Sequence, residues 1–426
     1  MSQWKVSSPH SWAAGGHPVR EVVSNHIDRM TMTGWIADTP LIDEFVSRRD
    51  LYPYYHVIED RPTPGEVVVD GIRAVNAAST DYLGLAADSG VRAAASQAAA
   101  KYGTCWTGSP MLGTVGLHRE LEEELADFLR RPAVMLTVTG FQANLTLSSL
   151  FGTGHMVIAD QHIHASLLES VRLGRAEYRR FGHNDVAHAE RLMRTSVDKG
   201  KVPVIVTEGA FSLGGDLCPV PELAALAKRY GGGLIIDGAH DIGVLGTDGR
   251  GAGEHFDVEE GIDLVTGTLC KAFGSVGGFV AGSVKAIRSL RHFGNAAMYS
   301  ASMAPASAAA ALASVRTARA RPELRAALRD SARRLHRGLA QQGHRLPSWP
   351  GPAVALPAGE PEQGLKTLEQ GLKTWRALLE AGVYTGAFLP PSVAGERLVL
   401  RLSVTAAHTP QQVDRILEVV GRLLPP

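Results

Sequence analysis

The sequence is poor in cysteine, with only Cys105, Cys218 and Cys270 among its 426 residues. None of them stands in a Cys-x-x-Cys spacing, so we expect neither a disulfide scaffold nor a cysteine-rich zinc site. Few cysteines also favour a reducing, cytoplasmic location. Long hydrophobic runs are missing too, since no stretch of about 18 apolar residues occurs that would span a bilayer. No apolar run follows the opening Met-Ser-Gln-Trp-Lys, so we expect no signal peptide.

Neither sign of charge is in excess. Lysine plus arginine and aspartate plus glutamate each number 43, and the isoelectric point is about 7.3. A nucleic-acid binder would carry a basic excess, and an anionic membrane would attract one, so both partners are disfavoured. Charged residues make up 20% and hydrophobic residues 45%, which excludes wholesale disorder. The length favours two or three domains with a substantial buried core.

Short apolar runs alternate with amphipathic segments between about residues 65 and 310. This alternation predicts an α/β fold, in which a mainly parallel sheet is covered by helices on both faces. Ligands of such sheets lie at the carboxyl ends of the strands, so polar residues there are the candidates for function. The expected strands are Val134–Val138, Met156–Ala159, Val202–Val206, Leu234–Asp237, Leu264–Thr268 and Gly278–Gly282, and the expected helices are Leu117–Arg130, Phe141–Leu150, Val186–Lys199 and Pro221–Tyr230.

Composition shifts divide the chain into three parts. We expect an N-terminal extension and arm over residues 1–65, a large domain over 66–310 and a small C-terminal α+β domain over 311–426. Arg20–Met30 fits a helix in the first part. The elements expected near and within the third part are one long helix over Ala309–Gly338, a loop or edge strand within Gly343–Glu360, a surface helix over the duplicated heptad in Glu362–Thr374, a strand at Leu398–Val404 and a closing helix at Gln411–Leu424.

Two residues at strand ends indicate covalent chemistry. Lys271 follows Leu264–Thr268, and an unpaired ammonium at the end of a buried strand is costly. Converting the amine to an imine with an aldehyde cofactor removes that cost, although a surface lysine in a glycine-rich loop is the simpler alternative. Asp237 ends another strand, where it can pair with a protonated pyridine nitrogen or merely cap the next turn. His240, three residues later, is within reach of a ring substituent.

Two further strand ends carry binding candidates. Thr139-Gly140-Phe141 opens a helix, and free N–H groups at a helix N-terminus bind phosphate. His164 follows Met156–Ala159, where it can lie flat on an aromatic ring or act as a hydrogen-bonded loop histidine. His162 and His164 have no partner motif of the metalloprotease kind, so we expect no metal site. Neither a dinucleotide-binding glycine motif nor a Walker A loop is present.

The order Thr-Gly-Phe, Asp-x-x-x-His-Ala-Ser, Asp-x-x-His and Thr-x-x-Lys, each at a strand end, resembles the fold-type I pyridoxal-phosphate enzymes, and more narrowly the α-oxoamine synthase family. The resemblance runs from about Leu51 to the C-terminus. It implies a large cofactor-binding domain and a small C-terminal domain, pyridoxal 5'-phosphate as cofactor, and a homodimer. The supporting segments are Asp81–Leu85, Tyr102–Thr104, Thr207–Ser212, Gly243–Gly246, Gly249–Gly251 and Arg401–His408.

The resemblance also implies roles for single residues. Lys271 binds the cofactor covalently, Asp237 pairs with the pyridine nitrogen and His164 stacks on the ring. With His240, these three form the expected catalytic set. The residues expected around the ring hydroxyl are His240 and Ser212, and those expected at the phosphate are Gly140, Phe141 and Thr268, with Ser300 or Ser302 added by the neighbouring subunit.

The substrate residues that the resemblance implies lie mostly near the C-terminus. Arg401 matches the arginine that binds the amino-acid carboxylate, and Ser392 matches a substrate-contacting threonine. Thr80 stands where the family has an asparagine near this substrate. The implied reaction is decarboxylative condensation of an amino acid with an acyl thioester, carried by coenzyme A or an acyl-carrier protein, to give an α-aminoketone, CO2 and a free thiol. In it Lys271 removes the Cα proton, and His164 hydrogen-bonds the thioester oxygen.

Two alternatives use the same residues differently. A related aldolase would cleave a β-hydroxy amino acid with the same cofactor and without a thioester. A non-catalytic partner subunit is the other alternative, as occurs where a family member has lost its lysine. The Asp81–Leu85 and Arg401–His408 segments favour the synthase, and the presence of Lys271 disfavours the partner subunit.

Overall fold

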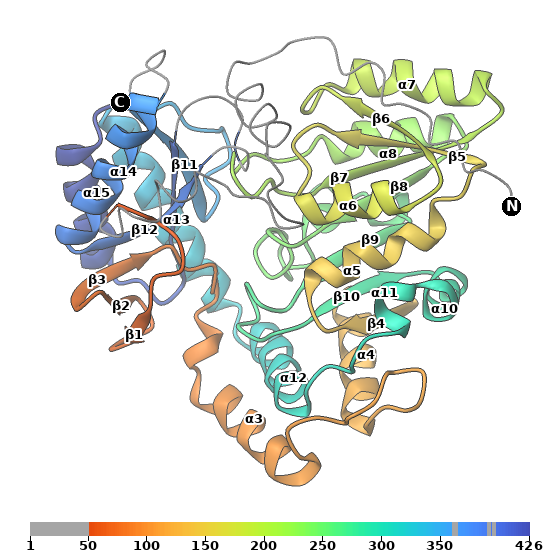
Figure 1. Cartoon of the computed structure of the whole chain (residues 1–426), viewed down its shortest axis with the longest axis horizontal. Coiled ribbons are helices and arrows are strands. Elements are labelled where there is room, and N and C mark those ends of the chain that lie inside the picture. Colours follow the sequence, from red (N-terminus) through yellow and green to blue (C-terminus); the bar gives the residue numbers. More distant parts are fainter. Residues whose placement is uncertain (1–50, 360–364, 390–392, 394–397) are drawn as a thin grey trace, which may run out of the picture.

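The computed structural model describes residues 51–359, 365–389, 393 and 398–426. Two sheets organise these residues, and they lie side by side in Figure 1. The helix expected at Arg20–Met30 and the predicted substrate residue Ser392 lie outside the described residues. No helix within the described ranges is long and apolar enough to cross a membrane.

The first sheet has seven strands in the order β4-β10-β9-β8-β7-β5-β6. Neighbours from β9 to β6 pair in parallel, whereas β10 is antiparallel to both β4 and β9. The predicted α/β fold with a mainly parallel sheet is therefore confirmed. The strands are β4 (Ala133–Thr137), β5 (His155–Asp160), β6 (Glu177–Phe181), β7 (Val202–Glu208), β8 (Gly233–Asp237), β9 (Leu264–Thr268) and β10 (Gly278–Gly282).

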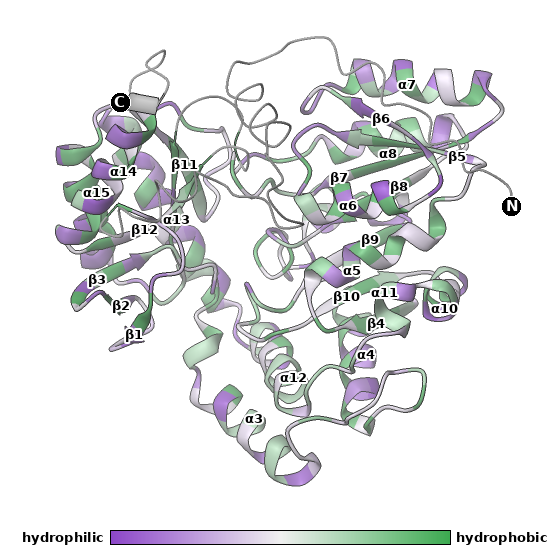
Figure 2. Cartoon of the chain, in the orientation of Figure 1, coloured by the Kyte–Doolittle hydropathy of each residue, from purple (hydrophilic) through white to green (hydrophobic). Residues whose placement is uncertain are grey.

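Helices bury both faces of this sheet, as its continuously apolar strands predict. Val157 and Val206 face one layer of helices, and their neighbours Ile158 and Ile205 face the other. Figure 2 shows these strands as mostly hydrophobic, between helices of mixed colour. The helices around the sheet are α4 (Gly116–Phe128), α5 (Gly140–Thr146), α6 (Ala165–Leu173), α7 (Val186–Asp198), α8 (Val220–Arg229) and α10 (Val284–Phe293), and the shorter ones are η1 (Leu85–Ala87), η2 (Leu147–Leu150), α9 (Ala252–His255), η3 (Glu259–Gly261) and α11 (Asn295–Met298).

The second sheet has six strands in the order β1-β2-β3-β12-β13-β11. Its strands come from both ends of the described chain, because β3 pairs in parallel with β12. The expected domain boundary at residue 66 placed β2 and β3 with the large domain, whereas their pairing joins them to the C-terminal sheet. The strands are β1 (Ile58–Asp60), β2 (Glu66–Val69), β3 (Ile72–Ala77), β11 (Ala353–Ala358), β12 (Val383–Phe388) and β13 (Leu398–Ser403), packed with α14 (Leu365–Glu380) and α15 (Pro410–Leu423).

The long helix expected over Ala309–Gly338 is two helices, α12 (Pro305–Ala320) and α13 (Glu323–Gln341). Pro322 causes the break, because proline disfavours the helical conformation of the residue before it. Arg321 accordingly has φ −124° and ψ 69°. Helix α12 lies against α3 (Ser89–Tyr102) below the two sheets in Figure 1, and α13 packs with the six-stranded sheet.

Candidate active site

Three parallel strands place polar side chains at one edge of the seven-stranded sheet. Glu208 ends β7 and is the register partner of Asp237, which ends β8, and Thr268 ends the neighbouring β9. Lys271 follows in the turn after β9. Because the carboxyl ends of parallel strands meet at one edge, these groups converge although they are spread along the sequence.

Lys271 is hydrogen-bonded to a buried histidine. Its Nζ lies 2.6 Å from His240 Nε2, and His240 Nδ1 lies 2.7 Å from the Tyr82 hydroxyl. Burial lowers the pKa of Lys271 and lowers that of His240 well below its ordinary value, and it raises the pKa of Tyr82 to about 12. At neutral pH the imidazole and the phenol are therefore both uncharged. The contact of Tyr82 with His240 was missed in the sequence, where Tyr82 served only as part of a motif.

Asp237 is held in place by a network of neutral polar groups. Asn144 on α5 donates from Nδ2 to Asp237 Oδ2 at 2.7 Å and to Ser166 Oγ at 2.8 Å. The Thr266 hydroxyl donates to Asn144 Oδ1 at 2.6 Å, and the Ala239 N–H donates to Asp237 Oδ1 at 2.9 Å. Asn144, Ser166 and Thr266 were not predicted as site residues. An asparagine on a short helix that follows a strand could have indicated Asn144 as one.

His164 caps helix α6 and keeps its ring exposed. Its Nδ1 accepts a hydrogen bond from the Ser166 N–H at 3.2 Å and lies 2.7 Å from Ser166 Oγ. Since Nδ1 accepts, the neutral ring carries its proton on Nε2. The Phe141 ring approaches edge-on, with centroids 6.4 Å apart. One imidazole face and an N–H donor are thus available to bound molecules.

Helix α5 begins beside the end of β9, at the predicted phosphate position. A Cβ on Gly140 would lie 2.8 Å from Thr268 Cβ, so no side chain fits between them. Thr139 caps the helix by accepting from the Gln142 N–H at 3.1 Å. The first N–H groups of a helix have no intrahelical partner and are suited to an anion. Gly140 and Thr268 therefore lie in contact beside the start of α5, and the binding of a phosphate by these residues and Phe141 stays a prediction.

Arg401 reaches the site from β13 of the other sheet. Its Nη1 donates to the Ser212 carbonyl at 3.3 Å, and its Cζ lies 4.7 Å from the centroid of the Phe388 ring. The Nε is buried without a hydrogen-bond partner, and no carboxylate of the described residues forms an ion pair with this guanidinium. Burial lowers its pKa. An arginine held in this way has unused donors for an incoming anion.

The remaining predicted residues are placed less directly. Thr80 is half-buried two residues before Tyr82, and its carbonyl accepts from the Tyr82 N–H at 2.7 Å. Ser302 donates to the Gly108 carbonyl of its own chain at 3.2 Å, and Ser300 is half-buried nearby. Contribution of either serine to a neighbouring subunit stays a prediction.

Glu208 is a buried acid that the sequence reading did not single out. Its side chain is 2% exposed, and Oε1 has no hydrogen-bond partner. Burial raises its pKa well above the ordinary value, the nearby Asp237 adds to this effect, and Lys271 opposes it. Burial and the neighbouring aspartate thus both favour the neutral form of Glu208.

The site has the complementary groups that pyridoxal phosphate requires. These groups are the amine of Lys271, the fixed carboxylate of Asp237 and the exposed imidazole face of His164. Gly140 packs against Thr268 with no room for a side chain, at the start of a helix whose first N–H groups suit a phosphate. The residues present thus fit this cofactor.

Comparisons with known proteins agree with this chemistry. The aminotransferase class I and II family model matches residues 74–420. The chain is 38% identical over 394 residues to a serine palmitoyltransferase of Caulobacter vibrioides, covering 90% of this chain and 96% of that protein. It is 38% identical over 383 residues to an 8-amino-7-oxononanoate synthase of Methylococcus capsulatus, covering 89% and 96%. A solved serine palmitoyltransferase from S. paucimobilis, with a bound pyridoxal phosphate–myriocin aldimine, superposes with a TM-score of 0.85 at 34% identity, covering 90% of this chain and 96% of that one.

Proposed function

The chain belongs to the α-oxoamine synthase family of pyridoxal-phosphate enzymes, and we propose that its amino-acid substrate has a small side chain and is held by Arg401. Enzymes of this family condense an amino acid with an acyl thioester. The new bond joins Cα to the acyl carbon, the thiol leaves, and the substrate carboxylate departs as CO2. Family membership disfavours the aldolase alternative, and an intact lysine in the site disfavours the non-catalytic subunit.

Each residue of the site has one task in this proposal. Pyridoxal phosphate, when bound, supplies the electron sink that takes up the electrons left on Cα. Asp237, oriented by Asn144, holds a proton on the pyridine nitrogen. Lys271 takes the proton from Cα with an Nζ whose pKa burial has lowered, which favours the neutral, basic amine. His164 donates from Nε2 to the thioester oxygen as negative charge develops there.

The single observation that supports amino-acid binding is the unpaired guanidinium of Arg401. A guanidinium with a buried Nε is normally paired, and among the described residues this one has no partner at Nε and contacts the Ser212 carbonyl and the Phe388 ring. A substrate carboxylate completes it with a bidentate pair. Thr80 is shorter than the asparagine of the family and presents a methyl group, which supports a side chain larger than that of glycine, such as that of alanine or serine.

We predict that Arg401→Ala raises the KM for the amino acid about a hundredfold while cofactor binding stays unchanged. Loss of a desolvated charge pair costs about 2–5 kcal/mol, and among the described residues Arg401 reaches the expected cofactor groups by a hydrogen bond only at the Ser212 backbone carbonyl. The measurement is a panel of glycine, alanine and serine with acyl thioesters of coenzyme A and of an acyl-carrier protein, with the aminoketone read by mass spectrometry.

Arg376→Ala is the matched control. Arg376 lies on α14, which packs with the six-stranded sheet that carries Arg401, and it pairs with Asp70 and Glu380. It should leave the KM unchanged. Formation of no aminoketone from any pair by the wild type would refute the proposed substrates. An unchanged KM in Arg401→Ala would refute the role of this residue alone.

We also propose that the enzyme is a homodimer. Trp106, Leu112 and Tyr299 are 41%, 75% and 70% exposed, and the segments that carry them are joined by the contact of Ser302 with Gly108. Large exposed apolar side chains near one another favour an interface. We predict that sedimentation of the active enzyme gives twice the chain mass, and that Leu112→Glu lowers this mass. An active wild-type monomer at assay concentration would contradict the proposal.

A further inference from the structure

The loop between β7 and α8, residues 210–217, contacts both sheets and is called here the β7–α8 loop. It is folded tightly, because Ala210 and Leu217 form an isolated bridge and the Phe211 N–H donates to the Asp216 carbonyl at 2.9 Å. Toward the six-stranded sheet, its Ser212 carbonyl accepts the hydrogen bond from Arg401. The loop is therefore part of the surroundings of the proposed amino-acid site.

A second contact joins this loop to the six-stranded sheet. A Cβ on Gly215 would lie 2.5 Å from the carbonyl oxygen of Ala353 on β11, so backbone packs directly against backbone at this point. Gly215 also has φ +67°, a conformation that favours glycine. Any movement of the β7–α8 loop therefore changes how the loop packs against the sheet that carries Arg401.

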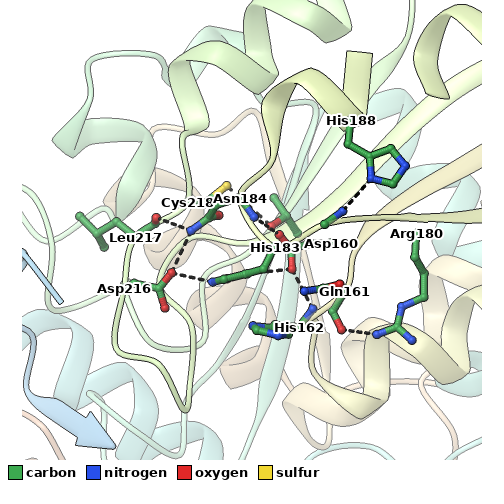
Figure 3. Close-up of polar contacts among 12 residues, drawn as sticks. Asp160, Gln161, His162, Arg180, His183, Asn184, His188, Asp216, Leu217 and Cys218 are labelled. Atoms are coloured by element: carbon green, nitrogen blue, oxygen red, sulfur yellow. Dashed lines mark hydrogen bonds and ion pairs between the residues drawn. The ribbon is translucent and has the colours of Figure 1, made fainter. Parts of the chain in front are cut away.

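On its other side the loop is tied to the seven-stranded sheet by an ionic chain, shown in Figure 3. His183 lies between two carboxylates, with Nε2 2.7 Å from Asp216 Oδ2 and Nδ1 3.0 Å from Asp160 Oδ1. Asp160 ends β5 and is fully buried. Asn184 reinforces the tie, since its Nδ2 donates to Asp216 Oδ2 at 2.8 Å and to the Leu217 carbonyl at 3.1 Å.

Both ring nitrogens of His183 face carboxylates, so both must donate, which only the imidazolium can do. Burial lowers the pKa of His183, but the hydrogen bonds and charges of Asp160 and Asp216 outweigh burial and raise it to about 9. The other titratable groups beside it are His162, whose ring stacks at 4.1 Å and whose pKa burial lowers, and Arg180, which donates to the Gln161 carbonyl. His183 is therefore charged at pH 7.

We propose that His183 is a positioning residue for the amino-acid site: its double ion pair fixes the β7–α8 loop, and the Ser212 carbonyl of that loop fixes the direction of the Arg401 guanidinium. The inference rests on the proposed role of Arg401 and extends it. Lys271, His240 and Asp237 make no contact with this chain of groups through any hydrogen bond of the described residues. Loss of the tie should therefore change amino-acid binding rather than proton transfer at Cα.

The test compares His183→Gln with wild-type holoenzyme at pH 7.5. Glutamine cannot place a charged donor on both carboxylates, so the amino-acid KM should rise about tenfold while kcat stays within about twofold. Hydrogen–deuterium exchange of peptides covering 210–217, measured without substrate, should quicken about tenfold. Asp216→Asn removes the opposite charge at similar size and should reproduce both changes. His188→Gln is the matched control, since His188 accepts from the Gly182 N–H and does not touch Asp216.

A pH series supplies a signature that a merely structural role would not give. The folded-state pKa of His183 is raised, so its charge is present below pH 9 and is lost as the pH rises through about 9. Wild-type exchange of 210–217, corrected for intrinsic exchange, should therefore show an additional rise near pH 9. This rise should be absent in His183→Gln.

Unchanged hydrogen–deuterium exchange of residues 210–217 in both variants would show that the ion pairs of His183 do not fix the β7–α8 loop. Faster exchange with an unchanged KM would overturn the positioning of Arg401 by the loop. A parallel fall of kcat and cofactor affinity would also overturn the proposal, because it would show general damage to the site. Failure of the proposed function is recognised separately, since the wild type would then form no aminoketone from any substrate pair, whatever the loop does.

Discussion

Lys271→Ala should lower turnover on the order of ten-thousandfold, because the substitution removes both the covalent attachment of the cofactor and the base at Cα. Lys271 is the amine that the fold brings to the strand ends beside His240, at 2.6 Å. Borohydride reduction of the wild-type holoenzyme should leave a pyridoxyl group on the peptide that contains Lys271. Peptide mass spectrometry together with single-turnover kinetics measures both effects.

Lys285→Ala is the matched control, since Lys285 lies on α10, outside the described site. It should keep activity and trapping intact. Trapping on another lysine, or turnover by Lys271→Ala near the wild-type rate, would contradict the assignment. A variant that binds the cofactor reversibly but turns over no substrate would agree with it, because Asp237, His164 and the start of α5 are left in place.

Asp237→Asn should slow the reaction about a thousandfold or more, since a neutral amide no longer holds a proton on the pyridine nitrogen. The change is nearly isosteric, but Asp237 accepts at both oxygens, from Asn144 and from the Ala239 N–H, so the asparagine amide meets one of these donors with its own NH2. The loss should therefore appear in kcat and in the absorption spectrum of the bound cofactor, together with a fall in thermal stability. Stopped-flow absorbance and steady-state kinetics provide the measurements.

Asp263→Asn tests whether any carboxylate beside β8 has this effect. Asp263 Oδ2 accepts from the Leu234 N–H at the opposite end of the same strand. Its replacement should leave kcat nearly unchanged. If Asp237→Asn retains a rate within tenfold of the wild type, Asp237 is only a turn cap that holds the Ala239 N–H.

The strand ends could be predicted from the sequence because each combines an apolar run with an abrupt polar residue. Asp237, Thr268, Lys271 and His164 were found in this way, and the structure brings them to one edge of a sheet. Tyr82 was not found, because its partner His240 is 158 positions away and nothing local marks the contact. Glu208 gave no separate signal, since its burial beside Asp237 depends on the pairing of β7 with β8.

The misjudged elements have physical causes of the same kind. Strand β6, Glu177–Phe181, carries two arginines and was overlooked because an edge strand has little need of an apolar run. The break before α13 was visible as Arg321-Pro322, but the helical pattern on both sides outweighed it. The expected boundary at residue 66 leaves β3 apart from β12, because nothing in the local sequence marks a parallel pairing over that distance.

The pairing of β3 with β12 also bears on synthesis of the chain. Val75 lies opposite Val383, so strands made early wait for a partner made near the end. The seven-stranded sheet closes between residues 133 and 282 and is complete well before that point. On the ribosome, β2 and β3 therefore emerge as a hairpin with one open edge, the kind of edge that invites pairing with other chains. That edge is covered only after residues 383–388 have left the ribosome. A pause late in translation therefore prolongs the interval in which the chain is most prone to aggregate.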